Sequence, residues 1–407
     1  MAALLSILPA SMIPQASLPW LEQTLIKQFE QLHTGEIRIS ISGGSSYVVR
    51  GEQAGPSADI HIEDVARLLK SVVIRGDLGF AESYMDGYWS SHDLTKLLYV
   101  LTLNLDAYEA TSRKSLPAHW FAKLLHRLNA NSLKGSRRNI AAHYDLGNDF
   151  YTQWLDPGMS YSSAVYYADE PLEEAQERKY EYLLSQIDPE PGDHILEIGC
   201  GWGGFVEYAA RWDMKVTAVT LSQEQYDYTV QRVNKLNLND RVEVLLTDYR
   251  TLHGQYDHIV SIEMFEAVGQ EYWSEYFSVL DRCLKPGGRA ALQVITIAEE
   301  HFEDYQKNEG GFIQRYIFPG GMLPTETHLR ELSWEVDLDP LEVTRYGEHY
   351  AATLADWKAR FNRKTDWLEA HGYDEKFRRM WRYYLSFCEA GFNEGRLDLV
   401  HLTMQKP

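Results

Sequence analysis

The 407-residue sequence contains few cysteines and no long apolar segment. Its three cysteines, Cys200, Cys283 and Cys388, are too few and too scattered for a disulfide framework, which favours a reducing compartment such as the cytoplasm. No stretch approaches the ~18 consecutive apolar residues of a membrane-spanning helix. No group of cysteines and histidines has the spacing of a zinc site, so we predict no structural metal.

Positive charge is also scarce. The apolar start, MAALLSILPASMIPQASLPW, lacks the basic residue that opens a signal peptide, because the first one is Lys27, and prolines interrupt it. We therefore expect an N-terminal arm or helix. The net charge of the chain is −20, and this charge would repel the phosphates of nucleic acid. Nucleic acid is accordingly excluded as a partner.

One segment carries the opposite charge. Residues 111–139 contain seven Lys or Arg residues and no Asp or Glu. Trp120, Phe121 and several leucines lie among them at helical spacing. A helix of this kind can lie on an anionic membrane surface, or it can pack against its own protein with its basic side in water. The pattern alone leaves both interpretations open.

The sequence pattern divides the chain into three parts. Residues 1–110 mix helical patterns with two short β-like runs, as in a small α+β domain, and residues 111–139 form a basic linker. In residues 140–407, strand patterns alternate with helical ones, which predicts a mainly parallel sheet between helices. Two late strand patterns would bring this sheet to seven strands. An insertion at about 298–330 lies where such sheets build a substrate pocket.

A glycine-rich loop, ILEIGCGWGGF at 195–205, ends the first strand of the predicted sheet. Gly199, Gly201 and Gly204 fit the loop of dinucleotide-binding enzymes, whereas Gly199, Gly201 and Gly203 fit the looser pattern of S-adenosylmethionine enzymes. Both patterns use glycine to let the backbone approach a ligand closely. The loop therefore predicts a nucleotide-like cofactor without identifying it.

The residues at the end of the second strand distinguish between a dinucleotide and S-adenosylmethionine. A dinucleotide enzyme needs an acidic residue there to bind the ribose. This strand ends in VTAVTLSQEQ, which offers Thr220, Ser222 and Gln225 instead. After the third strand, Asp248 or Tyr249 could meet an adenine. The strand order and these polar residues favour S-adenosylmethionine.

Several ordered motifs resemble the cyclopropane-fatty-acyl-phospholipid synthases, a family that includes the mycolic-acid methyltransferases. They are HYDLGNDFYTQWLDPGMSYSSAVY (143–166), LEIGCGWGGF, VTLSQEQY, SIEMFEAVG, YIFPGGMLP and RYYLSFCEAGF, and they cover residues 140–407. GDLGFAESYMDGYW (76–89) resembles the N-terminal domain of the full-length bacterial enzymes. The resemblance implies a Rossmann-like, seven-stranded class I S-adenosylmethionine methyltransferase domain after a smaller α+β domain.

The resemblance also implies a set of cofactor-binding residues. Two of them lie before the sheet and would close over the sulfonium end of the cofactor, and the others lie in the glycine loop and after the second and third strands. They are Tyr161, Ser162, Glu197, Gly199, Cys200, Gly201, Gly203, Thr220, Leu221, Ser222, Gln225, Tyr249 and Arg250. For Cys200, simple packing around the loop is an equally good interpretation.

Members of this family hold a bicarbonate ion with a cysteine, a glutamate, a histidine, an isoleucine amide and a tyrosine. Glu266, Ile295 and Tyr350 match three of these positions, whereas Ser163 and Gln293 replace the cysteine and the histidine. The site could retain a weaker bicarbonate, or Glu266 could itself be the base.

A further match falls near the end of the chain. Cys388 matches a cysteine that is often described as catalytic in the family. It lies in an aromatic helical pattern, where a buried structural cysteine is the commoner outcome. The proposed chemistry needs no covalent step on a thiol, so the resemblance alone places Cys388 among the candidates.

The resemblance implies an enzyme that transfers the methyl group of S-adenosylmethionine to a cis double bond of a phospholipid acyl chain and forms a cyclopropane through a carbocation. We expect it in the cytoplasm, peripherally on the inner face of the membrane, with a homodimer as one option. Ser163 and Gln293 keep a methylene- or methyl-branched product open. A non-catalytic lipid-binding protein and a small-molecule methyltransferase are the alternatives from other classes.

Overall fold

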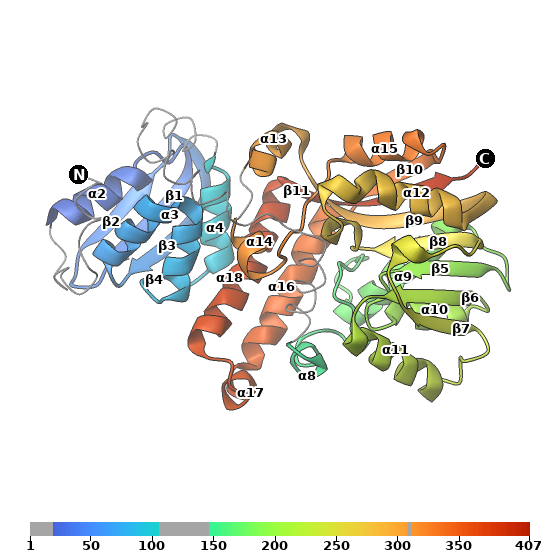
Figure 1. The fold of residues 1–407 in the computed structure, drawn as a ribbon. Coiled ribbons are helices and arrows are strands. Elements are labelled where there is room, and N and C mark those ends of the chain that lie inside the picture. Colours follow the sequence, from blue (N-terminus) through green and yellow to red (C-terminus); the bar gives the residue numbers. More distant parts are fainter. Residues whose placement is uncertain (1–18, 106–145, 308–310) are drawn as a thin grey trace. The chain divides into compact units, whose positions relative to one another are not determined.

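The computed structural model describes residues 19–105, 146–307 and 311–407, which form two compact units (Figure 1). Of these residues, the first unit contains 19–105, 311–316 and 364–394. The second contains 146–307, 317–363 and 395–407. The predicted basic segment 111–139 lies outside the described residues. None of the described helices is long and apolar enough to cross a bilayer.

The first unit is built on a four-stranded sheet with the order β2-β1-β3-β4. Its strands are β1 (Thr34–Ile41), β2 (Ser46–Arg50), β3 (Gln53–Ile62) and β4 (Trp89–Ser90). Helices α2 (Pro19–Phe29), α3 (Val65–Met85) and α4 (Leu94–Thr102) accompany it. Asp64 and Asp93 begin α3 and α4 by accepting hydrogen bonds from backbone amides of the first helical turn.

Three later helices also belong to the first unit, which differs from the predicted single domain over 140–407. They are α14 (Phe312–Tyr316), α17 (Thr365–Ala370) and α18 (Glu375–Glu394). The Arg379 guanidinium on α18 donates to the carbonyl oxygens of Tyr84 at 2.5 Å and Trp89 at 2.6 Å. The Tyr383 ring lies 5.7 Å from that of Tyr84. These contacts join α18 to the N-terminal sheet.

The second unit contains the predicted seven-stranded sheet, with the order β10-β11-β9-β8-β5-β6-β7. Its strands are β5 (His194–Ile198), β6 (Lys215–Thr220), β7 (Val242–Leu246), β8 (Tyr256–Ile262), β9 (Leu284–Ile297), β10 (Asp339–Arg345) and β11 (Leu397–Gln405). Strands β5 to β9 are mutually parallel, and β11 pairs antiparallel with both β9 and β10. The α/β prediction is confirmed.

Helices cover both faces of this sheet because successive strand residues point to opposite sides. Ile195 packs with helices α9 (Leu172–Ile187), α10 (Gly204–Arg211) and α11 (Gln223–Lys235). Its neighbour Leu196 packs with α12 (Trp273–Cys283) and α15 (Glu326–Glu335). The remaining elements of this unit are α8 (Asn148–Tyr151), α13 (Glu299–Lys307), α16 (Gly347–Arg363) and the short 3₁₀ turns η2 (Tyr249–Thr251), η3 (Phe265–Ala267) and η4 (Gln270–Tyr272).

The core of the sheet gives a direct test of this packing. Leu196 on β5 is fully buried, whereas Leu341 on β10 is 47% exposed. We expect Leu196→Ala to lower the free energy of unfolding by about 2–5 kcal/mol, because it leaves a cavity. Leu341→Ala should change it by less than about 1 kcal/mol. Urea unfolding of both variants measures the difference, and equal losses would contradict the assigned core.

Candidate active site

The glycine loop lies between β5 and α10, at the carboxyl end of the parallel strands. Gly199, Gly201 and Gly203 have φ angles of +84°, +52° and +82°, in the left-handed region that favours glycine. The amides of Gly199 and Cys200 donate to the Val219 carbonyl on β6 at 2.9 and 3.0 Å, which fixes the loop. A Cβ atom at Gly201 would meet no atom within 4 Å. The backbone at Gly201 therefore faces open space that a ligand can occupy.

A buried carboxyl group lies directly before this loop. Glu197 is 2% exposed, and its Oε2 atom has no hydrogen-bond partner among the described residues. Burial raises the pKa of Glu197 to about 8, opposed by the charges of Lys179 and Arg232. An unpaired buried oxygen is costly unless a ligand satisfies it. This atom and the open space at Gly201 fit a polar cofactor such as S-adenosylmethionine.

The residues after β6 form an ordered turn. The Thr220 hydroxyl donates to Gln225 Oε1 at 2.8 Å, and Ser222 Oγ accepts the Gln225 amide at 3.3 Å and begins α11. Leu221 is 39% exposed beside them. After β7, the Arg250 guanidinium pairs with the Asp248 carboxylate at 2.6 Å. The Tyr249 side chain is buried, and the centre of its ring lies 5.3 Å from that of Tyr276. The predicted cofactor residues thus gather at adjacent strand ends, and their role in binding stays a prediction.

Tyr161 and Ser162 lie before α9 in a loop beside aromatic side chains. The Tyr161 ring is 5.6 Å from Trp154, 5.4 Å from Trp357 and 6.3 Å from Phe318. Ser162 Oγ accepts a hydrogen bond from Lys179 Nζ at 2.7 Å. The loop therefore places an aromatic surface next to a buried cation. The preceding His143 and Tyr144 lie outside the described residues.

Lys179 on α9 is a functional candidate that the sequence did not indicate. Its side chain is fully buried, and this burial lowers the pKa of the ammonium to about 8, while Glu263, Asp156 and Glu197 favour its charged form. Lys179 lies on the buried face of α9 together with Gln176, and the sequence does not show which groups far along the chain surround it. Its charge nevertheless acts on both the glycine-loop acid and the carboxylate described next.

The Glu263 carboxylate lies at the centre of a second polar cluster, immediately after β8. Its Oε1 atom accepts hydrogen bonds from the Ser163 amide at 2.8 Å and from Gln293 Nε2 at 2.7 Å. Its Oε2 atom accepts the Tyr350 hydroxyl at 2.6 Å. Glu263 was missed because the motif match directed attention to Glu266. The available signal was a second acid three residues earlier in SIEMFEAVG.

The orientation of Gln293 follows from its neighbours. Gln293 Nε2 faces two acceptors, Glu263 Oε1 and, at 3.3 Å, the Ser163 carbonyl. Gln293 Oε1 lies 2.8 Å from Nε2 of His401, which faces Gln293 across the β9–β11 ladder. Burial lowers the pKa of His401 to about 3, so the ring is neutral and its Nε2–H donates. His401, also missed in the sequence, therefore aims the Gln293 amide at Glu263.

Glu266 in η3 is the second carboxyl group of the cluster. Its Oε1 atom accepts the Ile295 amide at 2.5 Å, and its buried Oε2 atom has no partner among the described residues. Burial and the nearby Glu263 charge raise the pKa of Glu266 to about 8. Glu266 is therefore protonated more easily than a carboxyl group in water.

The structure brings together the five residues that the resemblance assigns to a bicarbonate site, namely Ser163, Glu266, Gln293, Ile295 and Tyr350. Their donors are already engaged, because the Ser163 amide, the Gln293 amide and the Tyr350 hydroxyl donate to Glu263. The Ile295 amide donates to Glu266. A bicarbonate ion does not fit this donor set while the Glu263 carboxylate fills it.

Cys388 belongs to α18 and hence to the first unit, unlike the other candidates. Burial raises the pKa of its thiol to about 12. The thiol is therefore protonated at neutral pH and a weak nucleophile. Burial likewise raises the pKa of Cys200 in the glycine loop. Both cysteines have the character of packing residues.

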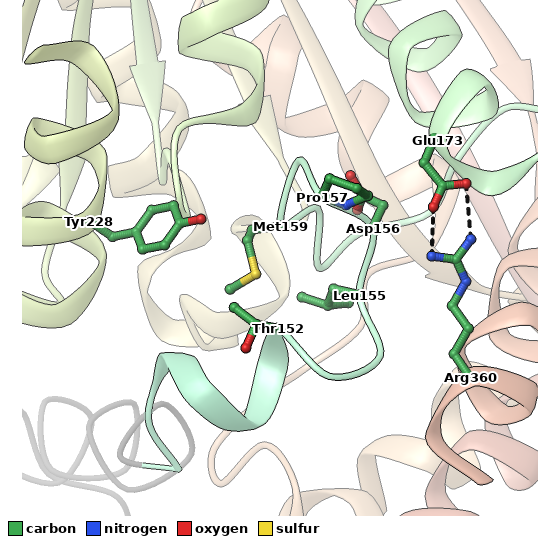
Figure 2. Close-up of a pocket in the computed structure, with 8 residues that line it drawn as sticks. All are labelled: Thr152, Leu155, Asp156, Pro157, Met159, Glu173, Tyr228 and Arg360. Carbon is green, nitrogen blue, oxygen red and sulfur yellow. Dashed lines mark hydrogen bonds and ion pairs between the residues drawn. The ribbon is translucent and has the colours of Figure 1, made fainter. Parts of the chain in front are cut away.

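A separate cavity of about 220 Å³ lies beside α8, α9, α11 and α16 (Figure 2). Arg360 on α16 pairs with both carboxylate oxygens of Glu173, at 2.8 and 3.0 Å. Asp156 accepts the amides of Gly158 and Ser160. The charged groups of this cavity thus have partners within the protein. The lining residues are Thr152, Leu155, Asp156, Pro157, Met159, Glu173, Tyr228 and Arg360.

Comparison with known protein families assigns the chain to one of them. Residues 131–402 match the family model described as mycolic acid cyclopropane synthetase. The chain belongs to this family. It is 38% identical to the tuberculostearic acid methyltransferase UfaA1 of Mycobacterium tuberculosis, over 90% of this chain and 87% of that protein. It is 36% identical to the cyclopropane-fatty-acyl-phospholipid synthase of Escherichia coli, over 86% of this chain and 88% of that protein.

Solved structures of the synthetase family share the fold. The mycolic acid cyclopropane synthase CmaA1, solved with SAH and CTAB, aligns with a TM-score of 0.62 at 32% identity and covers 66% of this chain and 98% of its own. The cyclopropane synthase MmaA2 of Mycobacterium tuberculosis aligns with a TM-score of 0.64 at 30% identity, covering 68% and 100%. The chain is an S-adenosylmethionine-dependent methyltransferase of lipid acyl chains, as predicted.

The open side of Gly201 gives a test of the cofactor site. We expect Gly201→Ala to cost about 1 kcal/mol of stability, because alanine tolerates its φ of +52° at about that cost. Binding of S-adenosylmethionine should weaken by tenfold or more, a loss of about 1.4 kcal/mol, because the methyl group would occupy cofactor space. Calorimetric titration measures this loss.

Gly287 provides the matched control. It has a φ of +79° and equally open surroundings, but it lies near the start of β9, at the opposite end of the strand from Gln293. Gly287→Ala should cost similar stability and leave cofactor affinity unchanged. Unaltered affinity in Gly201→Ala would place the cofactor elsewhere.

Proposed function

We propose that the chain transfers the methyl group of S-adenosylmethionine to a cis double bond of an unsaturated phospholipid acyl chain and forms a cyclopropane. The observation that supports this proposal most directly is the set of groups at two strand ends of the second unit. A glycine loop and a Glu197 oxygen with no partner among the described residues lie at the end of β5, and two buried carboxyl groups follow β8. Strands β5 and β8 are neighbours, so their carboxyl ends lie side by side. This arrangement supports methyl transfer that is followed by proton removal nearby.

The chemistry sets three requirements on the protein. S-adenosylmethionine supplies an electrophilic methyl group, and its addition to an alkene leaves a positive charge on the neighbouring acyl carbon. Aromatic faces stabilise such a charge, and the Tyr161–Phe318 surface offers them. Water must be kept away because it would trap the cation as an alcohol. Finally, a base must remove one proton, which calls for an anionic group such as a carboxylate.

The product depends on which proton leaves. Removal from the incoming methyl group closes a cyclopropane when the cation is on the neighbouring carbon, and it gives a methylene branch when a hydride shift has first moved the cation to the methylated carbon. Removal from the acyl chain instead leaves a methyl branch beside a shifted double bond. One relative named above is a methyltransferase and the other a cyclopropane synthase, so similarity supports both outcomes. We favour the cyclopropane, with a methylene- or methyl-branched chain as the second candidate.

The enzyme is tested by expressing it in a bacterium whose lipids contain cis-unsaturated chains, with the methyl group of methionine fully deuterated. We expect phospholipid acyl chains one methylene unit heavier, with one deuterium lost from the transferred methyl. Mass spectrometry measures the label, and proton NMR of the purified lipid separates cyclopropane from vinylic signals. Cofactor binding with no labelled lipid would instead support a lipid-binding protein.

We also propose that the enzyme works on the inner face of the membrane and that the basic segment 111–139 contributes to binding there. Each basic residue near an anionic surface is worth about 1 kcal/mol. Replacing Arg113, Lys114, Arg137 and Arg138 by glutamine should therefore reduce co-sedimentation with anionic vesicles strongly at low salt. Vesicles of neutral lipid provide the control. Unchanged sedimentation of the variant would assign the segment to packing against the protein.

A further inference from the structure

The hydrogen bonds to Glu263 come from three separate parts of the second unit. The Ser163 amide lies in the loop before α9, Gln293 lies on β9, and the Tyr350 hydroxyl lies on α16. An ionised carboxylate offers about four lone-pair positions, and these donors use three of them. One position therefore remains for a proton from outside the cluster. The arrangement is a cage for an anion that has one open acceptor site.

The backbone at Glu263 is itself unusual. Its φ is +49°, a left-handed conformation that costs a non-glycine residue about 1 kcal/mol or more. The Glu263 amide donates to the Gln293 carbonyl at 2.8 Å, which holds this conformation. Glycine would adopt it without strain. Strain of this kind persists where the surrounding structure imposes it, and here it directs the carboxylate into the three donors.

The two carboxyl groups of the cluster differ in the hydrogen bonds and charges that stabilise their ionised forms. Glu263 accepts three hydrogen bonds and lies near the Lys179 charge, whereas Glu266 accepts one bond from Ile295. Burial raises the pKa of both groups, but the charge on Glu263 additionally raises that of Glu266. When the pair holds a single proton, the proton therefore resides on Glu266 and the negative charge on Glu263.

We propose that Glu263 is a catalytic residue and the proton acceptor of the reaction, a built-in carboxylate that takes the place of a bound bicarbonate ion. The inference rests on the methyl transfer proposed above. As the C–S bond breaks, the alkene π electrons form the new C–C bond. The electrons of a C–H bond next to the cation then close the ring, and its proton moves to the open lone pair of Glu263. Gln293 and His401 are positioning residues that hold the carboxylate in place.

Two variants separate the charge of Glu263 from its shape. Glu263→Gln keeps the size but cannot accept the proton, and we expect turnover of lipid to fall by at least ~10²-fold, with binding of S-adenosylmethionine retained. Glu263→Gly relieves the left-handed backbone and empties the donor cage. It should remain folded and lose activity to a similar extent. Near wild-type turnover in Glu263→Gln would overturn the proposal.

Asp337→Gly is the matched control for the backbone. Asp337 is an exposed acid in the same unit with a φ of +57°, so its replacement likewise exchanges a left-handed acidic residue for glycine, away from the cluster. We expect this variant to keep wild-type turnover. The change in its thermal unfolding midpoint measures the effect on stability of placing glycine at a left-handed backbone position while the site is unaltered.

Added bicarbonate provides the decisive measurement. In carbonate-free buffer, wild-type turnover should not respond to millimolar bicarbonate, whereas Glu263→Gly should regain activity severalfold or more. Glu266→Gln should not be rescued, because its replacement leaves the three-donor cage filled by Glu263. Strong stimulation of the wild type by bicarbonate would overturn the proposal.

Binding is measured apart from turnover by the thermal midpoint and by the NMR signal of ¹³C-labelled bicarbonate. Glu263→Gly should bind the ion and gain stability, and the wild type should do neither. This readout needs no lipid, so it tests the cage even if the proposed lipid reaction is wrong. Conversely, if the wild type methylates lipid and Glu263→Gln does so at the same rate, the proposed role of Glu263 is refuted while the proposed lipid reaction stands.

Discussion

The stabilisation of a buried negative charge at Glu263 is the interaction on which the rest of the site depends. A carboxylate removed from water needs hydrogen-bond donors, and those of Glu263 come from three separate parts of the chain. The loop before α9, β9 and α16 must therefore all be in place before the charge is tolerated. The seven-stranded sheet supplies this order, since β8 presents Glu263 and the adjacent strand β9 presents Gln293.

The same low-dielectric surroundings connect the cluster to the cofactor loop. Lys179 bonds to Ser162, and its charge acts on both Glu197 and Glu263. Electrostatic effects of this kind are strong where water is excluded. Glu197 and Glu266 each retain a buried oxygen with no partner among the described residues, whereas both oxygens of Glu263 accept hydrogen bonds and one acceptor position of Glu263 stays open. The two unpaired oxygens are therefore the places where bound molecules would complete the hydrogen bonding.

Much of the fold followed from the sequence, because its signals are local. Alternating strand and helix patterns located the parallel strands, and the glycine loop needed backbone angles that glycine adopts easily. The placement of α18 did not follow, because an amphipathic helix reveals an apolar face without identifying what covers it. Glu263 and His401 were missed for a related reason. Their roles arise from strand register and from loops far apart in sequence, which a motif in one segment does not encode.

Glu263 gives a physical reason for the two departures from the family pattern, at positions 163 and 293. Ser163 contributes its backbone amide, a group that every residue except proline possesses, so losing the thiol side chain costs the cage nothing. Gln293 contributes an amide N–H that carries no charge and cannot lose its proton at neutral pH. A cage with neutral donors and a permanently attached carboxylate does not depend on the concentration of a dissolved ion. Ser163, Gln293 and Glu263 therefore act as one set, in which the protein itself carries the negative charge that the proposed proton transfer needs.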